Sequence, residues 1–165
     1  MNNWGWGAYD GSWGLGFLRE SDAQGFLPAV QYYQLVGDAG SESNVYRTVQ
    51  NAAVMKTHFG DFKLLMQRAK DFDKPVLSLL EADAFGFLQQ TNGNPNAPAA
   101  IASTGLPELA GVPNTVAGWG QAFLKLRSAV VQLPSNAAVP LAELGLEVST
   151  SASSTGALYV DAVSW

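Results

Sequence analysis

A long segment with helical spacing lies between two short apolar runs, and this order constrains the fold more than any other feature of the chain. From residue 43 to 72, apolar side chains recur every three or four positions, which predicts a helix with a bend or break at Gly60. The flanking runs, residues 25–37 and 74–80, are short and rich in apolar residues, as buried strands are. The order strand, helix, strand predicts a βαβ unit with parallel strands.

Residues with capping side chains precede two of the expected helices. Ser43 or Asn44 can cap the long helix, and Thr115 can cap a second helix that ends with Lys125 and Arg127 in its last turn. The first 25 residues alternate glycines with aromatic side chains, which favours a short strand or a loop.

Beyond the second expected helix, the pattern of residues along the sequence changes. Residues 129–165 contain short β-like runs separated by Pro, Ser and Gly. The chain therefore divides into a βα body, residues 1–128, and a β-rich tail, residues 129–165. A tail of this length cannot bury a core of its own, so we expect it to pack on the body or on a second chain within one compact domain.

Composition excludes several classes of function. The chain has 165 residues, a formal net charge of −5 and a pI near 4.6, which argues against a nucleic-acid partner. It has no Cys, so disulfides, thiolate catalysis and Cys-based metal sites are excluded. No apolar run reaches the length of a membrane span, and the start lacks the pattern of a signal peptide. We expect no cofactor, no metal and no membrane partner.

Two acids end the second apolar run. Residues two apart on a strand point to the same side, so Glu81 and Asp83 are expected to present their carboxylates together at the end of the strand. Two carboxyls of unequal pKa are what acid and base catalysis on a glycosidic bond requires. Asp10 is a third candidate acid. The alternative is that an acid at a strand end caps a helix or joins an ion pair.

Aromatic and amide side chains add a candidate binding surface. Aromatic rings suit the C–H faces of sugars, and amides can bond their hydroxyls. The candidate residues are Trp6, Trp13, Tyr33, Gln34 and Gln89, with plain core packing as the alternative. Core packing is the expectation for Tyr32 and Trp119. His58, the sole histidine, lies within the helical pattern without a catalytic motif, so a structural role is expected.

Three segments carry a resemblance to a known family. They are "WGAYDGSWGLGFLRESDAQGFLPAVQYYQLVG", "HFGDFKLLMQRAKDFDKPVLSLLEADAFGFLQQ" and "GLPELAGVPNTVAGWGQAFLKLR". Together, residues 4–128 resemble the opening part of a bacterial glycoside-hydrolase-like (β/α)8 barrel family. Residues 131–165 resemble the last strands of a β-sandwich carbohydrate-binding module. The resemblance implies an α/β fold, a partial (half) TIM barrel with parallel βα units plus a C-terminal antiparallel β segment.

The resemblance also implies a function. It points to a glycoside hydrolase that cleaves a β-linked glucan or aryl glycoside, with Glu81 in the mouth of the barrel, and to a secreted or extracytoplasmic parent family. The alternatives are a non-catalytic carbohydrate-binding protein and a structural half-barrel fragment without activity. A half-barrel exposes sheet edges and apolar faces, so we expect a homodimer or higher homo-oligomer.

Overall fold

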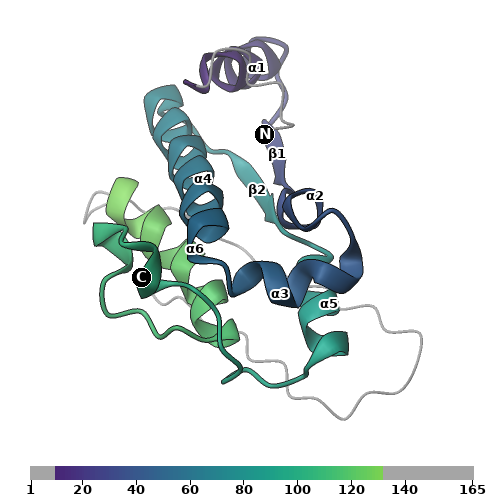
Figure 1. Ribbon diagram of the computed structural model, residues 1–165. Helices are drawn as coiled ribbons and strands as arrows, with labels where there is room; N and C mark the ends of the chain where they lie inside the picture. Colours follow the sequence, from purple (N-terminus) through teal and green to yellow (C-terminus); the bar gives the residue numbers. More distant parts are fainter. Residues whose placement is uncertain (1–9, 132–165) are drawn as a thin grey trace. The chain divides into compact units, whose positions relative to one another are not determined.

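The computed structural model describes residues 10–131, and about 61% of these residues are helical (Figure 1). The chain divides into two compact units, residues 1–132 and 133–165. The described residues all belong to the first unit.

A single parallel strand pair forms the sheet of this unit. Strand β1 (Ala29–Tyr32) pairs with β2 (Leu77–Leu80), with Ala29 opposite Leu77 and Tyr32 opposite Leu80. The predicted βαβ unit with parallel strands is therefore confirmed. The carboxyl ends of both strands lie at the same edge of the sheet (Figure 1).

The connection between the strands is helical but is broken at a residue other than the predicted one. It contains α2 (Leu35–Ala39), the 3-10 turn η1 (Glu42–Asn44), α3 (Val45–Val49) and α4 (Ala52–Phe72). The break lies at Asn51, whose side-chain oxygen accepts hydrogen bonds from the first amides of α4. The predicted break at Gly60 is wrong, because α4 passes through Gly60 without interruption.

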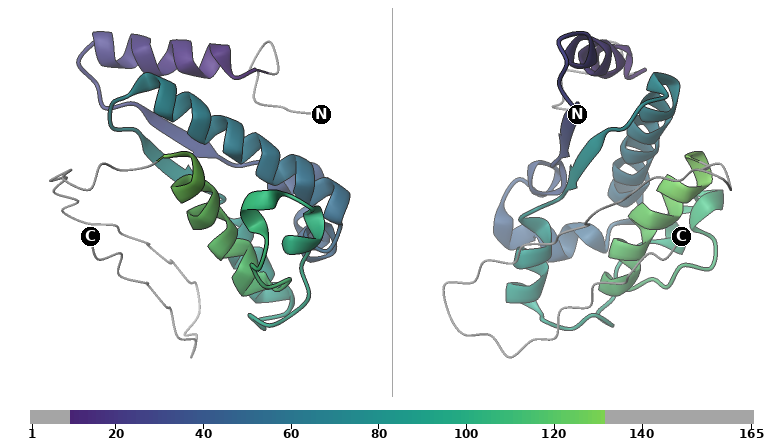
Figure 2. Two further views of the ribbon diagram at one scale, coloured as in Figure 1. Left: turned by 90° about the vertical axis from the view of Figure 1, so that its left-hand side faces the viewer. Right: turned by 180° about the vertical axis from the view of Figure 1, so that it is seen from behind.

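Before β1, the chain forms a helix where a strand or loop was expected. Helix α1 (Ser12–Ala23) begins after Asp10, whose carboxylate accepts a hydrogen bond from the Ser12 amide at 2.9 Å. The helix formers of its second half, "FLRESDA", outweigh the glycines of its first. Helix α1 lies across the C-terminal end of α4, where the Arg68 guanidinium donates to the Asp10 carbonyl at 2.7 Å (Figure 2).

After β2, the regular elements of the described residues are helices and 3-10 turns, joined by loops. Helix α5 (Ala84–Thr91) is followed by two 3-10 turns, η2 (Ala102–Thr104) and η3 (Pro107–Leu109), and by α6 (Val116–Val130). The predicted Thr115 cap is confirmed, since its hydroxyl oxygen accepts from the Gly118 amide at 3.1 Å. The predicted β-rich tail lies outside the described residues except for its start, where Ala129 and Val130 belong to α6.

One face of the sheet and helices α4 and α6 enclose the core. Tyr32, Phe59, Phe62, Trp119 and Phe123 are buried there with edge-to-face ring contacts. The burial of Tyr32 and Trp119 confirms their expected core packing. The opposite face of the sheet is open, because the side chains of Leu77 and Leu79 are 59% and 53% exposed.

The expectation of a half TIM barrel with an added antiparallel β segment is wrong. A barrel continues its parallel sheet through eight strands, each followed by a helix. In the described residues the sheet ends after two strands, because the segments on either side of the βαβ unit form α1, α5 and α6. The apolar runs in these segments carry helical spacing, and the helices pack on the connection between the strands, α1 and α6 on α4 and α5 on α3 (Figure 2).

Candidate functional site

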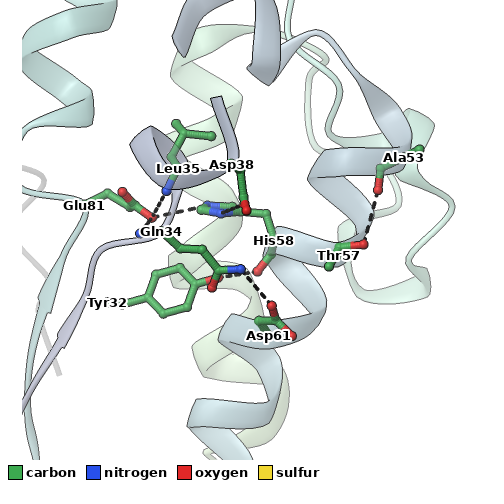
Figure 3. A network of polar contacts seen from close by, with 9 residues as sticks. All are labelled: Tyr32, Gln34, Leu35, Asp38, Ala53, Thr57, His58, Asp61 and Glu81. Carbon is green, nitrogen blue, oxygen red and sulfur yellow. Dashed lines mark hydrogen bonds and ion pairs between the residues drawn. The ribbon is translucent and has the colours of Figure 1, made fainter. Parts of the chain in front are cut away.

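The carboxyl ends of the two strands place a glutamate against the start of α2 (Figure 3). Glu81 follows β2 directly, and the chain turns there through a left-handed conformation with φ of 43°, which is unusual for a residue with a side chain. Its Oε1 atom accepts hydrogen bonds from the amides of Gln34 at 2.8 Å and Leu35 at 3.0 Å. Glu81 therefore caps α2 from a strand that is remote in sequence, and its side chain is fully buried.

His58 of α4 lies between two carboxylates. Its Nε2 atom is 3.8 Å from Oε1 of Glu81, and its Nδ1 atom is 3.9 Å from Oδ2 of Asp38 on α2 (Figure 3). These separations exceed a hydrogen bond, so the contacts are ion pairs when the ring is charged. We name Asp38, His58 and Glu81 the α2 cluster.

Aromatic rings enclose the imidazole of His58. The ring stacks on Trp119 with centroids 6.1 Å apart and makes edge contacts with Tyr32, Phe59 and Phe123. The Tyr32 hydroxyl donates to the carbonyl oxygen of His58. The ring is completely buried and therefore has little freedom to reorient.

Two further polar contacts border the cluster. The Gln34 side-chain amide donates to Asp61 Oδ2 at 2.9 Å, which ties the start of α2 to α4 (Figure 3). Burial raises the pKa of the Tyr32 phenol well above its usual range, with added effects of the Asp61, Glu81 and Asp38 charges. Tyr32 is therefore a hydrogen-bond donor at neutral pH and does not ionise there.

Burial also controls the ionisation of Glu81. Loss of water raises the pKa of the Glu81 carboxyl above its ordinary value of 4.5, and the Asp38 charge acts in the same direction. His58 and the two amide hydrogen bonds from Gln34 and Leu35 oppose this rise without cancelling it. Glu81 thus combines a held position with a carboxyl that is protonated more readily than an ordinary glutamate.

Asp83 lies in a different environment from Glu81. It precedes α5, is exposed to solvent, and accepts a hydrogen bond from the Tyr33 hydroxyl at 3.0 Å. The two acids were expected on one side of a strand, but β2 ends at Leu80 and the turn at Glu81 interrupts the alternation. Glu81 consequently points inward and Asp83 is accessible.

The structure brings together four of the sequence-predicted site residues. Tyr33, Gln34, Glu81 and Asp83 all lie at the carboxyl ends of the strands. Gln89 is exposed further along α5. Trp6 lies outside the described residues.

Asp10 and Trp13 belong to the opposite end of the unit. Asp10 contacts Arg68, which lies ten residues beyond His58 on α4 and hence about 15 Å along the helix axis. The hydrogen bond from the Ser12 amide lowers the pKa of the Asp10 carboxyl. Trp13 is 61% exposed and stacks on Phe17, with centroids 6.4 Å apart and planes within 12°.

Sequence reasoning missed Asp38 and Asp61 as members of this region and missed the pairing of His58 with Glu81. A usable signal existed for His58 alone, because it lies three residues after Met55 and four before Phe62, both of which are buried. This spacing placed His58 on the core-facing stripe of α4. Nothing in the local sequence indicated which acids would meet it there.

Other classes of site find no support in the described part of the chain. Residues 10–131 contain no group of three or more His, Cys, Asp or Glu side chains that could hold a metal ion. Within the same range, no helix has the length and apolar character to cross a membrane.

Comparisons with known proteins do not identify a relative. No protein-family model matches this chain, and no significant similarity to a curated protein or a solved structure was found.

Proposed function

We propose that this protein hydrolyses a glycosidic bond of a β-linked glucan or aryl glycoside, with Glu81 as proton donor and Asp83 as the second catalytic carboxyl. The observation that carries the proposal is the contrast between the two acids. Glu81 is buried with a raised pKa, whereas Asp83, two residues later, is exposed to solvent. Carboxyls in such unlike environments are the basis of acid and base assignments in glycosidases.

The start of α2 must move for this chemistry to occur. Glu81 is covered by Gln34 and Leu35, so a substrate reaches its carboxyl only when these residues move aside. Helix α2 is a single short turn whose start depends on Glu81 itself. The Tyr33 hydroxyl beside Asp83 supplies a polar group at the accessible side of the site.

Release of reducing sugar tests the proposal. We expect the wild type to release sugar from β-linked glucans or nitrophenyl β-glycosides, and Glu81→Gln and Asp83→Asn each to lower the rate by about 100-fold or more. Glu20→Gln makes the same chemical change at an exposed position of α1 and should leave the rate unchanged. Full activity in Glu81→Gln would refute the assigned proton donor, and no release by the wild type from any substrate would refute hydrolysis.

Carbohydrate binding without hydrolysis is a second candidate function. The Trp13 and Phe17 rings are exposed and stack with nearly parallel planes, and exposed aromatic rings of this kind can stack on sugar rings. Under this proposal, native electrophoresis in a gel that contains β-glucan should retard the wild type. Trp13→Ala should migrate as in a plain gel, whereas Phe26→Ala, which removes an aromatic ring that is 65% exposed outside this pair, should remain retarded.

A further inference from the structure

The α2 cluster has too few hydrogen-bond donors when its acids are ionised and its histidine is neutral. Both ring nitrogens of His58 face carboxylate oxygens, one on Asp38 and one on Glu81. A neutral imidazole carries a single N–H, so its second nitrogen then directs a lone pair at an anion. One further proton, on the ring or on Glu81, converts that repulsion into an attraction.

Gain or loss of this proton acts directly on helix α2, because both acids make contacts that hold the helix in place. Asp38 belongs to α2, and Glu81 accepts the amides of Gln34 and Leu35 at its start. His58 belongs to α4, so the cluster fastens α2 to α4 and to the end of β2 (Figure 3). The stacked Trp119 ring keeps the imidazole between the two carboxyls.

We propose that Asp38, His58 and Glu81 form a proton-dependent latch on α2, closed when the cluster shares a second proton and loosened when that proton is lost as pH rises. The other titratable groups near the latch are Asp61 and Tyr32. Asp61 accepts from the Gln34 side chain, and the Tyr32 hydroxyl donates to the His58 carbonyl. The raised pKa of Glu81 supports the direction, because it shows that the folded environment favours the protonated carboxyl.

Hydrogen exchange of the Gln34 and Leu35 amides reports directly whether the latch is closed. Rates are expressed as protection factors, which removes the intrinsic effect of pH on exchange. Between pH 5 and pH 8, we expect wild-type protection of these amides to fall by about tenfold, because loss of the shared proton removes the attraction between His58 and the two carboxyls that hold α2. The Ala53 and Val54 amides, which bond to the neutral Asn51 side chain, are an internal control and should keep constant protection.

Two variants separate a latch from general loosening of the protein. Glu81→Gln retains an oxygen that can accept the two amides but cannot titrate, and Asp38→Asn removes the charge facing Nδ1 of His58. We expect both to abolish or strongly flatten the pH dependence of protection. Constant protection in the wild type, or the wild-type slope in both variants, would overturn the latch.

The single histidine provides a second readout. His58 is the only histidine of the chain, so one ring C–H resonance reports the cluster. Its chemical shift should change with the same midpoint as the protection of the Gln34 and Leu35 amides, and a different midpoint would contradict the latch. Neither measurement requires sugar hydrolysis, so the latch can be confirmed where the proposed function fails, or refuted where hydrolysis is found.

Discussion

Helices α4 and α6 begin with caps from their own sequence, whereas α2 begins with a cap from a strand far along the chain. Asn51 caps α4 and Thr115 caps α6 through neutral side chains next to the helix they serve. The two amides at the start of α2 instead bond to Glu81, 47 and 46 residues away. A local cap can form in an isolated helix, but a remote cap forms only after β1 and β2 have paired.

The two kinds of cap also differ in how much they contribute to the stability of the fold. Asn51 caps at an exposed site, where water can replace its bonds. Glu81 is fully buried, so loss of its carboxyl leaves two amides without a partner in a place that water reaches poorly. We therefore expect α2 to depend on the assembled sheet, and α4 and α6 to depend mainly on their own sequence and packing.

Removal of the remote cap should have the largest effect. Glu81→Ala should lower the free energy of unfolding by about 4 kcal/mol, because the Gln34 and Leu35 amides lose their shared acceptor in a buried place. Urea unfolding followed by circular dichroism measures the loss. Glu81→Gln, which retains an acceptor oxygen, is the matched control and should cost much less. Equal losses in the two variants would show that charge, and not capping, is what Glu81 supplies.

A second large effect is expected at Gly118, whose amide bonds to the Thr115 cap of α6 and whose Cα lies close to the Pro113 backbone. A Cβ atom added at Gly118 would lie 2.0 Å from the Pro113 carbonyl oxygen, and backbone cannot yield as a flexible side chain does. We expect Gly118→Ala to lower the free energy of unfolding by about 3 kcal/mol. The control is Gly60→Ala in the middle of α4, where no atom lies within 4 Å of the added carbon.

Gly60→Ala should stabilise the protein by about 0.5 to 1 kcal/mol, since alanine favours the helix and meets no neighbour. The same urea titration measures both glycine variants. If Gly118→Ala were as stable as wild type, the tight turn from Pro113 into Thr115 would not be a requirement of the α6 start.

The two kinds of cap should also differ in their response to pH. Because the folded pKa of Glu81 is raised above 4.5, its contribution to stability is fully present below pH 4.5 and is lost as pH rises through the folded pKa. The slope is at most about 1.4 kcal/mol per pH unit for one proton. Subtraction of the Glu81→Gln profile from that of the wild type, measured by urea unfolding from pH 4 to pH 8, isolates this group. A difference that grows more favourable to wild type with rising pH has the wrong sign and would contradict the raised pKa.

Sequence reasoning succeeded where structure depends on neighbours in the chain. The parallel βαβ unit, the Thr115 cap and the burial of Trp119 followed from spacing and from the preferences of single residues. The position of Glu81 at the end of a strand followed in the same way. These features need no knowledge of distant partners.

The features that sequence reasoning failed to predict depend on residues that are far apart in the chain. Whether the sheet gains a third strand depends on what the chain does after α5, where η2, η3 and α6 follow and not the next strand that the barrel resemblance implied. The role of Glu81 depended on His58 and on the start of α2, both of which reach it only through the fold. The turn at Glu81 has no local sign in the sequence either, because a glutamate rarely adopts positive φ.

Removal of a local cap should cause the smallest loss of stability, and this loss should be independent of the remote cap. Asn51→Ala removes one acceptor shared by the Ala53 and Val54 amides and should lower the free energy of unfolding by about 1 kcal/mol. Asn51→Asp retains the acceptor and serves as the control. Since Asn51 caps α4 and Glu81 caps α2, we expect the losses in the Asn51→Ala, Glu81→Ala double variant to add within about 0.5 kcal/mol. A larger interaction energy would mean that the start of α4 is energetically coupled to the α2 cluster through His58, two turns along the same helix. The two kinds of cap would then belong to one cooperative unit.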